Sequence, residues 1–147
     1  MNPSCFFKRL APLGLLVFAA ALQASDVALT NGQNAENVVG QTDAGGAAVF
    51  NEGTPYDSQR LEGFNLPIDV EVDTASHRLF VCDYFSSRVL EYDLDSSNVL
   101  VDRTADHVLG QTSFYGNIDA TAANRMKTPA GIEFDPSSNR LFVGDYL

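Results

Sequence analysis

The chain has 147 residues, of which 45% are hydrophobic and 19% are charged, a composition typical of a folded globular protein and not of a disordered one. Nineteen acidic side chains against nine basic ones give a formal net charge of -10, which repels phosphate backbones and anionic lipid surfaces. The composition therefore argues against nucleic acid and membrane-surface partners.

The N-terminal segment, 1–25, has the pattern of a secretory signal peptide. Lys8 and Arg9 precede an apolar stretch at 10–22, and small residues follow it, so we expect cleavage within 21–25. The stretch is shorter than the roughly 20 apolar residues that a membrane-spanning helix needs. A buried core helix is the alternative, but the stretch contains a proline and a glycine, which are poor residues inside a helix.

Export has consequences for charge and for cysteine chemistry. Cleavage removes two basic residues and no acid, leaving seven basic against nineteen acidic side chains and a formal charge of -12. It also removes Cys5, so Cys82 is the remaining cysteine and cannot form an intramolecular disulfide. We expect a secreted protein, extracellular or periplasmic, with no membrane span in its mature chain.

The mature chain repeats itself. The segment 66–84, LPIDVEVDTASHRLFVCDY, matches 128–146, TPAGIEFDPSSNRLFVGDY, at an offset of 62, with ten of nineteen positions identical. A second block, VVGQT at 38–42, recurs as VLGQT at 108–112, at an offset of 70. The difference between the two offsets falls in the linker between the blocks, where repeat proteins place loop insertions.

Each copy is predicted to be a series of short strands. Apolar and acidic residues alternate over 68–73, the period of a β-strand, and a polar turn follows at 74–77. Further strands are predicted at 78–82, at 89–92 and up to 108–111, separated by polar turns. Four consecutive antiparallel strands without a helix are the unit of a β-propeller blade.

The pattern LPIDVEVD, HRLFVCDYFSSRVLEYD and HVLGQT resembles the NHL-repeat family of β-propellers, in detail its bacterial secreted members. The resemblance implies an all-β, partial propeller: a signal peptide at 1–25, then a propeller fragment over 26–147. Within it we expect an outer strand at 35–42, a full blade at 66–112 and an incomplete blade at 128–147. Because propellers close with about four to eight blades, we expect a fragment that aggregates or multimerises alone.

Two residue types recur in both copies at places where a structural role is expected. Asp83 and Asp145 follow the second strand of each copy and precede a turn, where a carboxylate accepts backbone N–H bonds and caps the hairpin. Arg78 and Arg140 are expected to bind a neighbouring carboxylate or carbonyl at a blade corner. A residue repeated in every blade serves every blade, so we assign neither pair to catalysis. Cys82 aligns with Gly144 and is expected to be a small buried residue rather than a reactive thiol.

Acidic residues on the first strand of each copy are candidate ligand contacts. The resemblance implies that this strand lies nearest the propeller axis, and Asp69, Glu71 and Glu133 make it more acidic than the family pattern. Carboxylates converging there from several blades could hold calcium in the full-length protein. The alternative for the glutamates is a solvated or arginine-paired position, and we predict no metal site from these residues alone.

Aromatic residues supply the second candidate surface. Tyr84 and Phe85 follow the second strand, and further rings lie in the long linkers at positions 50, 56, 64, 114 and 115. These rings could gather on one rim, with about half of them covering blade interfaces instead. The resulting hypothesis is a non-enzymatic scaffold that binds a protein, glycan or small ligand. The alternative is an extracellular propeller enzyme of lactonase or lyase type, with a metal near the axis.

Overall fold

A computed structural model gives the fold and describes residues 31, 32, 34, 35, 37–42, 47, 63–116, 118 and 122–146. The chain divides into two compact units, Met1–Asn34 and Ala35–Leu147. All strands belong to the second unit, and the described residues are all-β, without a helix. The predicted signal peptide lies outside the described residues. Nowhere in the described part is there a helix long and apolar enough to cross a membrane.

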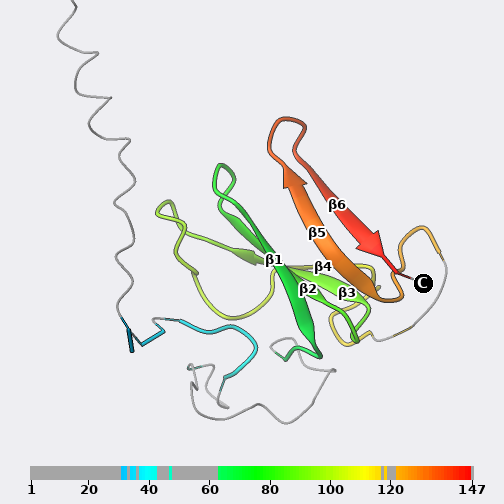
Figure 1. The fold of residues 1–147 in the computed structure, drawn as a ribbon, viewed down its shortest axis with the longest axis horizontal. Coiled ribbons are helices and arrows are strands. Elements are labelled where there is room, and N and C mark those ends of the chain that lie inside the picture. The colour runs from blue at the N-terminus through cyan, green and yellow to red at the C-terminus, as the bar shows by residue number, and fades with distance from the viewer. Residues whose placement is uncertain are drawn as a thin grey trace, which may run out of the picture. The chain divides into compact units, whose positions relative to one another are not determined.

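The first sheet is an antiparallel meander of four strands in chain order (Figure 1). Its strands are β1 (Pro67–Asp73), β2 (Arg78–Asp83), β3 (Arg88–Asp93) and β4 (His107–Leu109). Alternating side chains point to opposite faces, so Phe80 and Cys82 lie on one face and Val81 on the other. The four predicted strands and the turns between them are thus confirmed.

The second sheet repeats the first two strands of the first. It consists of β5 (Pro129–Asp135) and β6 (Arg140–Asp145), paired antiparallel. Both hairpins begin with a proline that pairs with an aspartate, Pro67 with Asp83 and Pro129 with Asp145, and both ladders shift register directly after that proline. The repeat in the sequence is therefore a repeat of backbone geometry, down to the position of the irregularity.

The two hairpin turns share one backbone conformation. The last turn residue, His77 in the first and Asn139 in the second, has a positive φ, 57° and 51° respectively. Asparagine and histidine are among the non-glycine residues that most readily adopt this left-handed region. The carboxylate that precedes each turn accepts backbone N–H bonds within it, Asp73 from Ala75 and Ser76, and Asp135 from Ser137.

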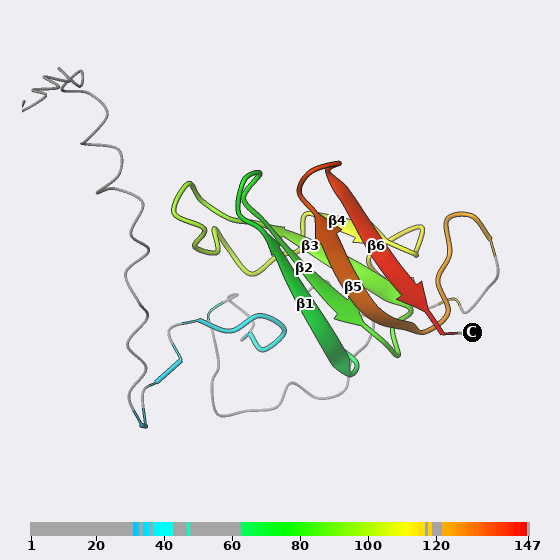
Figure 2. The same ribbon diagram turned by 45° about the horizontal axis from the view of Figure 1, so that its top comes forward.

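The two sheets stack, and β2 is buried on both sides. On one side Phe80, Cys82 and Val89 form an apolar cluster with Ile132 of β5. On the other side Val81, Leu90, Tyr92 and Ala105 form a second cluster. β5 lies against β1 and β2, and both ribbon views show the second hairpin alongside the first, with the two turns at the same end (Figures 1 and 2).

The segment predicted as an outer strand, 35–42, differs from the expectation. Among the residues described there, Thr42 alone forms a β-bridge and none belongs to a strand. A strand requires a continuous ladder partner, and a single bridge does not supply one. The packing of the segment still follows the repeat. Val39 contacts the cluster of Val81 and Leu90, while its repeat equivalent Leu109 contacts the cluster that contains Ile132 of the second sheet.

Candidate functional site

A fully buried ion pair lies at the end of the first sheet where β2 ends and β3 begins. The Nε of Arg88 donates to Asp83 Oδ2 at 2.9 Å, and both side chains are completely buried. Asp83 Oδ1 accepts the backbone N–H of Asn65 at 2.7 Å. Because both carboxylate oxygens and the guanidinium are paired, the site avoids the desolvation cost of an isolated buried charge.

The Arg88 guanidinium ties three separate segments together. Its Nη1 donates to the carbonyl oxygen of Phe114 at 2.6 Å, and its Nη2 donates to the carbonyl oxygen of Gly63 at 2.7 Å. These carbonyls belong to the linker after β4 and to the segment before β1. Arg88 therefore anchors the connecting segments onto the sheet, a role that the sequence did not reveal.

Asp145, which is exposed, accepts the equivalent backbone hydrogen bond in the second repeat. Its carboxylate accepts the backbone N–H groups of Lys127 and Thr128, and Lys127 is the repeat equivalent of Asn65. The expectation that these aspartates accept backbone N–H bonds is confirmed. The expected location was wrong, because the N–H groups belong to the segment leading into the preceding strand and not to the turn that follows the aspartate.

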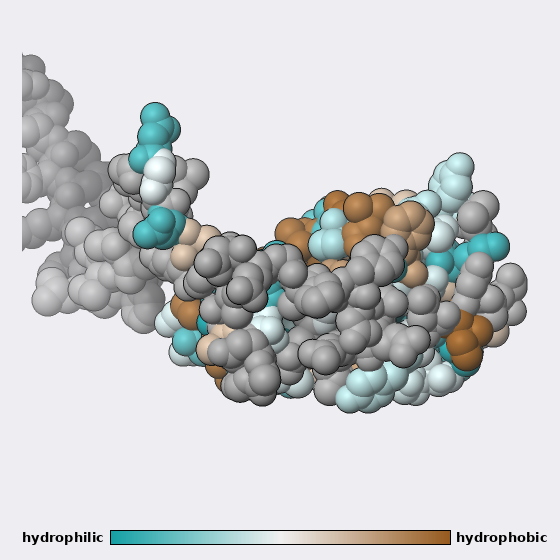
Figure 3. All heavy atoms as spheres, turned by 90° about the horizontal axis from the view of Figure 1, so that it is seen from below, coloured by the Kyte–Doolittle hydropathy of each residue, from teal (hydrophilic) through white to brown (hydrophobic). Residues whose placement is uncertain are grey.

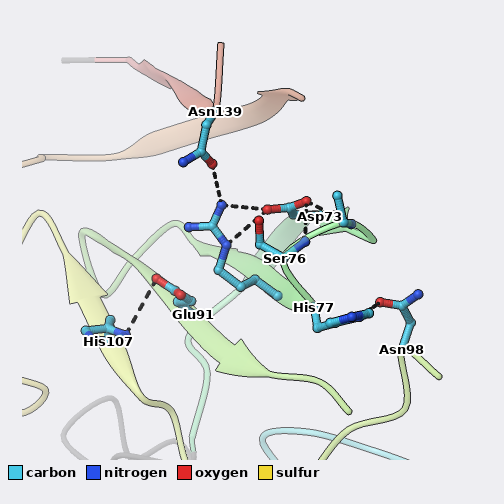
Figure 4. A network of polar contacts seen from close by, with 9 residues as sticks. Asp73, Ser76, His77, Glu91, Asn98, His107 and Asn139 are labelled. Carbon is cyan, nitrogen blue, oxygen red and sulfur yellow. Dashed lines mark hydrogen bonds and ion pairs between the residues drawn. The ribbon is translucent and has the colours of Figure 1, made fainter. Parts of the chain in front are cut away.

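Arg78 links the two sheets at the opposite end (Figure 4). Its Nε and Nη2 donate to Asp73 Oδ2 at 3.1 and 2.6 Å, and Nη2 also donates to Asn139 Oδ1 at 2.7 Å. The guanidinium lies over the stacked rings of Phe80 and Phe134, at 5.3 and 5.5 Å from their centroids. The predicted carboxylate contact of Arg78 is confirmed, whereas its counterpart Arg140 is exposed.

The surroundings of Asp73 keep its carboxyl ionised. Burial opposes ionisation, but hydrogen bonds from Arg78, Ser76 and Ala75 outweigh it and lower the pKa of Asp73 from 3.8 to about 2. A lowered folded-state pKa stabilises the protein above pH 3.8, and this contribution disappears as the pH falls towards 2.

We therefore expect Asp73→Asn to lower the free energy of unfolding by about 1.5–3 kcal/mol at neutral pH, the range for hydrogen bonds to charged groups. The difference between the wild type and the variant should shrink as the pH falls from 3.8 to about 2. Urea unfolding at several pH values measures it. A difference that stays constant across this range would contradict the ion pair.

Asp69, a predicted ligand residue, holds the two sheets together. Its Oδ1 accepts the N–H of Val70 at 3.0 Å, and its Oδ2 accepts the N–H of Ile132 on β5 at 2.9 Å. Asp69 and Glu133 both line an open depression of about 640 Å³ beside β5 and β6. Glu71 is half-buried on β1 and lies outside the lining of that depression, so the structure brings two of the three acids together.

Tyr84 and Phe85, the predicted aromatic contacts, form an edge-to-face pair with centroids 5.0 Å apart. Backbone N–H groups of both residues donate to the carbonyls of Leu66 and Asn65, which fixes the turn against the segment before β1. Phe85, Tyr115 and Tyr146 are exposed. Tyr146 is the repeat equivalent of Tyr84. We call the set Tyr84, Phe85, Tyr115 and Tyr146 the aromatic rim.

Of the other four rings in the prediction, the structure describes two. Phe64 and Phe114 are partly buried against the cluster on one face of the first sheet. Positions 50 and 56 lie outside the described residues. At the opposite end of the sheets the hairpin turns consist of small and polar residues, TASH at 74–77 and PSSN at 136–139. The exposed rings of the rim thus belong to the end of the sheets opposite these hairpin turns.

Cys82 is a buried free cysteine. Its thiol donates to the carbonyl of Pro129 at 3.1 Å, and burial together with the nearby Asp69 and Asp83 carboxylates raises its pKa to about 11. The thiolate is the nucleophilic form of cysteine, so this side chain is unreactive at neutral pH. The prediction of a small buried residue is confirmed.

The Gly-Gln pair of the repeated VxGQT block has a structural role that sequence reasoning missed. Gly110 has φ 82° and lies so close to Met126 that a Cβ would be 2.6 Å from its Cγ; Gly40 has φ 79° and has the same relation to Phe64. Phe64 and Met126 occupy equivalent positions of the repeat, just before the first strand of each copy. In both cases the glycine therefore packs against the side chain that precedes the next copy. The recurrence of the Gly-Gln pair in both copies is the sequence signal that points to this structural role.

Gln111 organises the linker that follows. Its buried amide donates to the carbonyls of Ser87 and Ile118, and its Oε1 accepts from the Ile118 N–H and from Arg125. The amide thus fastens the linker to the β2–β3 turn that carries Phe85. It contributes to the rigidity of the aromatic rim.

Within the described part, no group of three or more His, Cys, Asp or Glu side chains is placed to hold a metal ion. Calcium binding by Glu71 and Glu133 stays a prediction. The chain matches no model of a known protein family, and no curated protein matches it.

Proposed function

We propose that this chain supplies consecutive blades of a secreted NHL-type β-propeller that serves as a binding scaffold. The observation that carries the proposal is the combination of two sheets with identical hairpin register and an exposed aromatic rim at one end of them. The ligand is a protein, a glycan or a small molecule that contacts the rim.

The stacking of the sheets supports the propeller part of the proposal. One face of the first hairpin is covered by the opposite face of the second hairpin, so the same contact can be repeated indefinitely from sheet to sheet. Blades of a propeller pack in this way around a central channel. Arg78 and Asp69 add polar contacts between the sheets, to Asn139 and to the backbone of Ile132.

The rim supports the binding part. Tyrosine and phenylalanine bury large areas at little cost in conformational entropy, which is why they are enriched at binding surfaces. The turn that carries Tyr84 and Phe85 is held by the neighbouring Arg88–Asp83 pair and by Gln111. A rigid support lowers the ordering cost of binding.

The test is a binding screen with matched variants. The chain is immobilised and probed with a glycan array and with purified secreted proteins from the same source. A ligand of the rim should bind at least about 10-fold more weakly to Phe85→Ser/Tyr115→Ser, a loss of about 1.4 kcal/mol. Val101→Ser, which alters an exposed apolar residue away from the rim, is the control. A ligand equally affected by both variants, or by neither, contradicts the proposal.

A further inference from the structure

The contact between the two hairpins defines a pair of complementary faces. The front face of the first hairpin carries Arg78, Phe80 and Cys82 and is covered by β5–β6. The back face of the second hairpin, which covers it, carries Ile132, Phe134, Leu141 and Val143. These two faces already form a well-packed interface within one chain.

The sequence repeat places a second copy of each face on the opposite sides of the same structure. The front face of β5–β6 carries Arg140, Phe142 and Gly144, the equivalents of Arg78, Phe80 and Cys82. The back face of β1–β2 carries Val70, Val72, Leu79 and Val81, the equivalents of Ile132, Phe134, Leu141 and Val143.

Described residues on both of these second faces are exposed to solvent. Phe142 is 56% exposed, and the depression of about 640 Å³ lies on its face of β5–β6. Val70 is 58% and Val72 is 42% exposed on the back face of β1. The space-filling view shows that hydrophobic residues reach the surface of the described part (Figure 3).

Part of the back face of β1–β2 is covered within the chain. The β2 side of the back face is already covered, because Val81 and Leu79 pack with Val39 and Leu100. The uncovered part lies on β1. Within the chain, β1 is also the strand of the first hairpin that β5 contacts most. β5–β6 is a hairpin of the two equivalent strands, with the same register as β1–β2.

We infer that a second copy of this chain docks the back face of its β1 onto the front face of β5–β6, head to tail. Phe142 then packs on Val72 of the second copy, as Phe80 stacks on Phe134 at 6.0 Å within one chain. Arg140 approaches His77 of the second copy, as Arg78 bonds Asn139 at 2.7 Å. His77 and Asn139 have the same backbone conformation, so the geometry of the turn supports the equivalence.

The contact between copies is weaker than the contact within the chain. Gly131 stands where Asp69 bonds the neighbouring sheet, and Gly144 stands where Cys82 bonds Pro129. Both side-chain hydrogen bonds between the sheets are therefore missing. Because each copy has one front face and one back face, association is heterologous and leads to a ring or to an open filament.

The test blocks one face at a time in the full-length chain. Val72→Asp blocks the back face and Phe142→Asp blocks the front face, while Val101→Asp places the same charge on an exposed residue of neither face. Sedimentation measures association, and circular dichroism checks that each variant melts as the wild type does. We expect the wild type and Val101→Asp to associate and each blocked variant to associate at least about 100-fold more weakly, since a charge is expensive to bury.

An equimolar mixture of the two blocked variants separates this contact from others. One free back face and one free front face remain, so the mixture should form a one-to-one pair and nothing larger. In a Cys5→Ser background, Val72→Cys and Phe142→Cys chains should become joined by a short thiol crosslinker when mixed. A monomeric wild type, association that survives both blocks, or a mixture without pairs or crosslinks overturns the inference.

Discussion

Replacing Arg88 with leucine is expected to lower the free energy of unfolding by about 3–5 kcal/mol, the usual cost of removing one partner of a buried ion pair. The substitution leaves the Asp83 carboxylate buried without its cation and leaves the carbonyls of Gly63 and Phe114 without their donor. Urea unfolding followed by circular dichroism measures the loss.

Two companion variants distinguish the ion pair from a general effect of losing an arginine. Arg140→Gln changes an exposed arginine and should alter stability by no more than about 0.5 kcal/mol. Arg88→Leu/Asp83→Asn removes the unpaired charge and should be less destabilised than the sum of the two single variants. A loss below about 1 kcal/mol for Arg88→Leu would show that the pair does not hold the linkers.

Gly110→Ala is expected to lower the free energy of unfolding by about 2–5 kcal/mol, from backbone strain and overpacking together. The residue has φ 82°, which costs an alanine about 1–2 kcal/mol. The new methyl group would lie 2.6 Å from Met126 Cγ and 2.7 Å from its Sδ, and overpacking of this kind costs a further amount of about 1–3 kcal/mol. Thermal and urea unfolding measure the combined effect.

The two contributions can be separated. Met126→Ala in the Gly110→Ala background removes the contacts with Cγ and Sδ and leaves the backbone strain and the contact with the Cβ of residue 126 at 2.9 Å, so the second substitution should cost less there than in the wild type. Gly144→Ala is the matched control, because its Cβ would meet the Gly131 carbonyl at an ordinary 3.7 Å and should change stability by about 1 kcal/mol or less. Equal losses for Gly110→Ala and Gly144→Ala would contradict the role of the repeated glycine.

These two sites hold described parts of the linkers against the sheets. Gly110 accepts the side chain of Met126, and Arg88 bonds the linker carbonyl of Phe114. Each therefore fixes the path from one sheet to the next. The path in turn sets the stacking of the sheets and the position of the aromatic rim.

The acidic residues of the first strand show where sequence reasoning reached its limit. Asp69, Glu71 and Glu133 share a strand type and a charge, and on the sequence alone they form one group. In the structure Asp69 bonds the backbone of Ile132, whereas Glu133 is exposed beside the depression. The partner of Asp69 is distant in the sequence, and no local pattern identifies such a contact.

Strands, turns and the repeat were readable from the chain alone, because each depends on neighbouring residues: alternation over 68–73, turn formers at 74–77, and identity at a fixed offset. The buried Arg88–Asp83 pair, the sheet-to-sheet bonds of Arg78 and Asp69, and the choice of covered and open faces depended on packing between distant segments. Side chains at equivalent positions, such as Phe80 and Phe142, have the same local sequence and opposite burial. Whether another sheet lies against them is a property of tertiary structure, and it decides which of the two is core and which is surface.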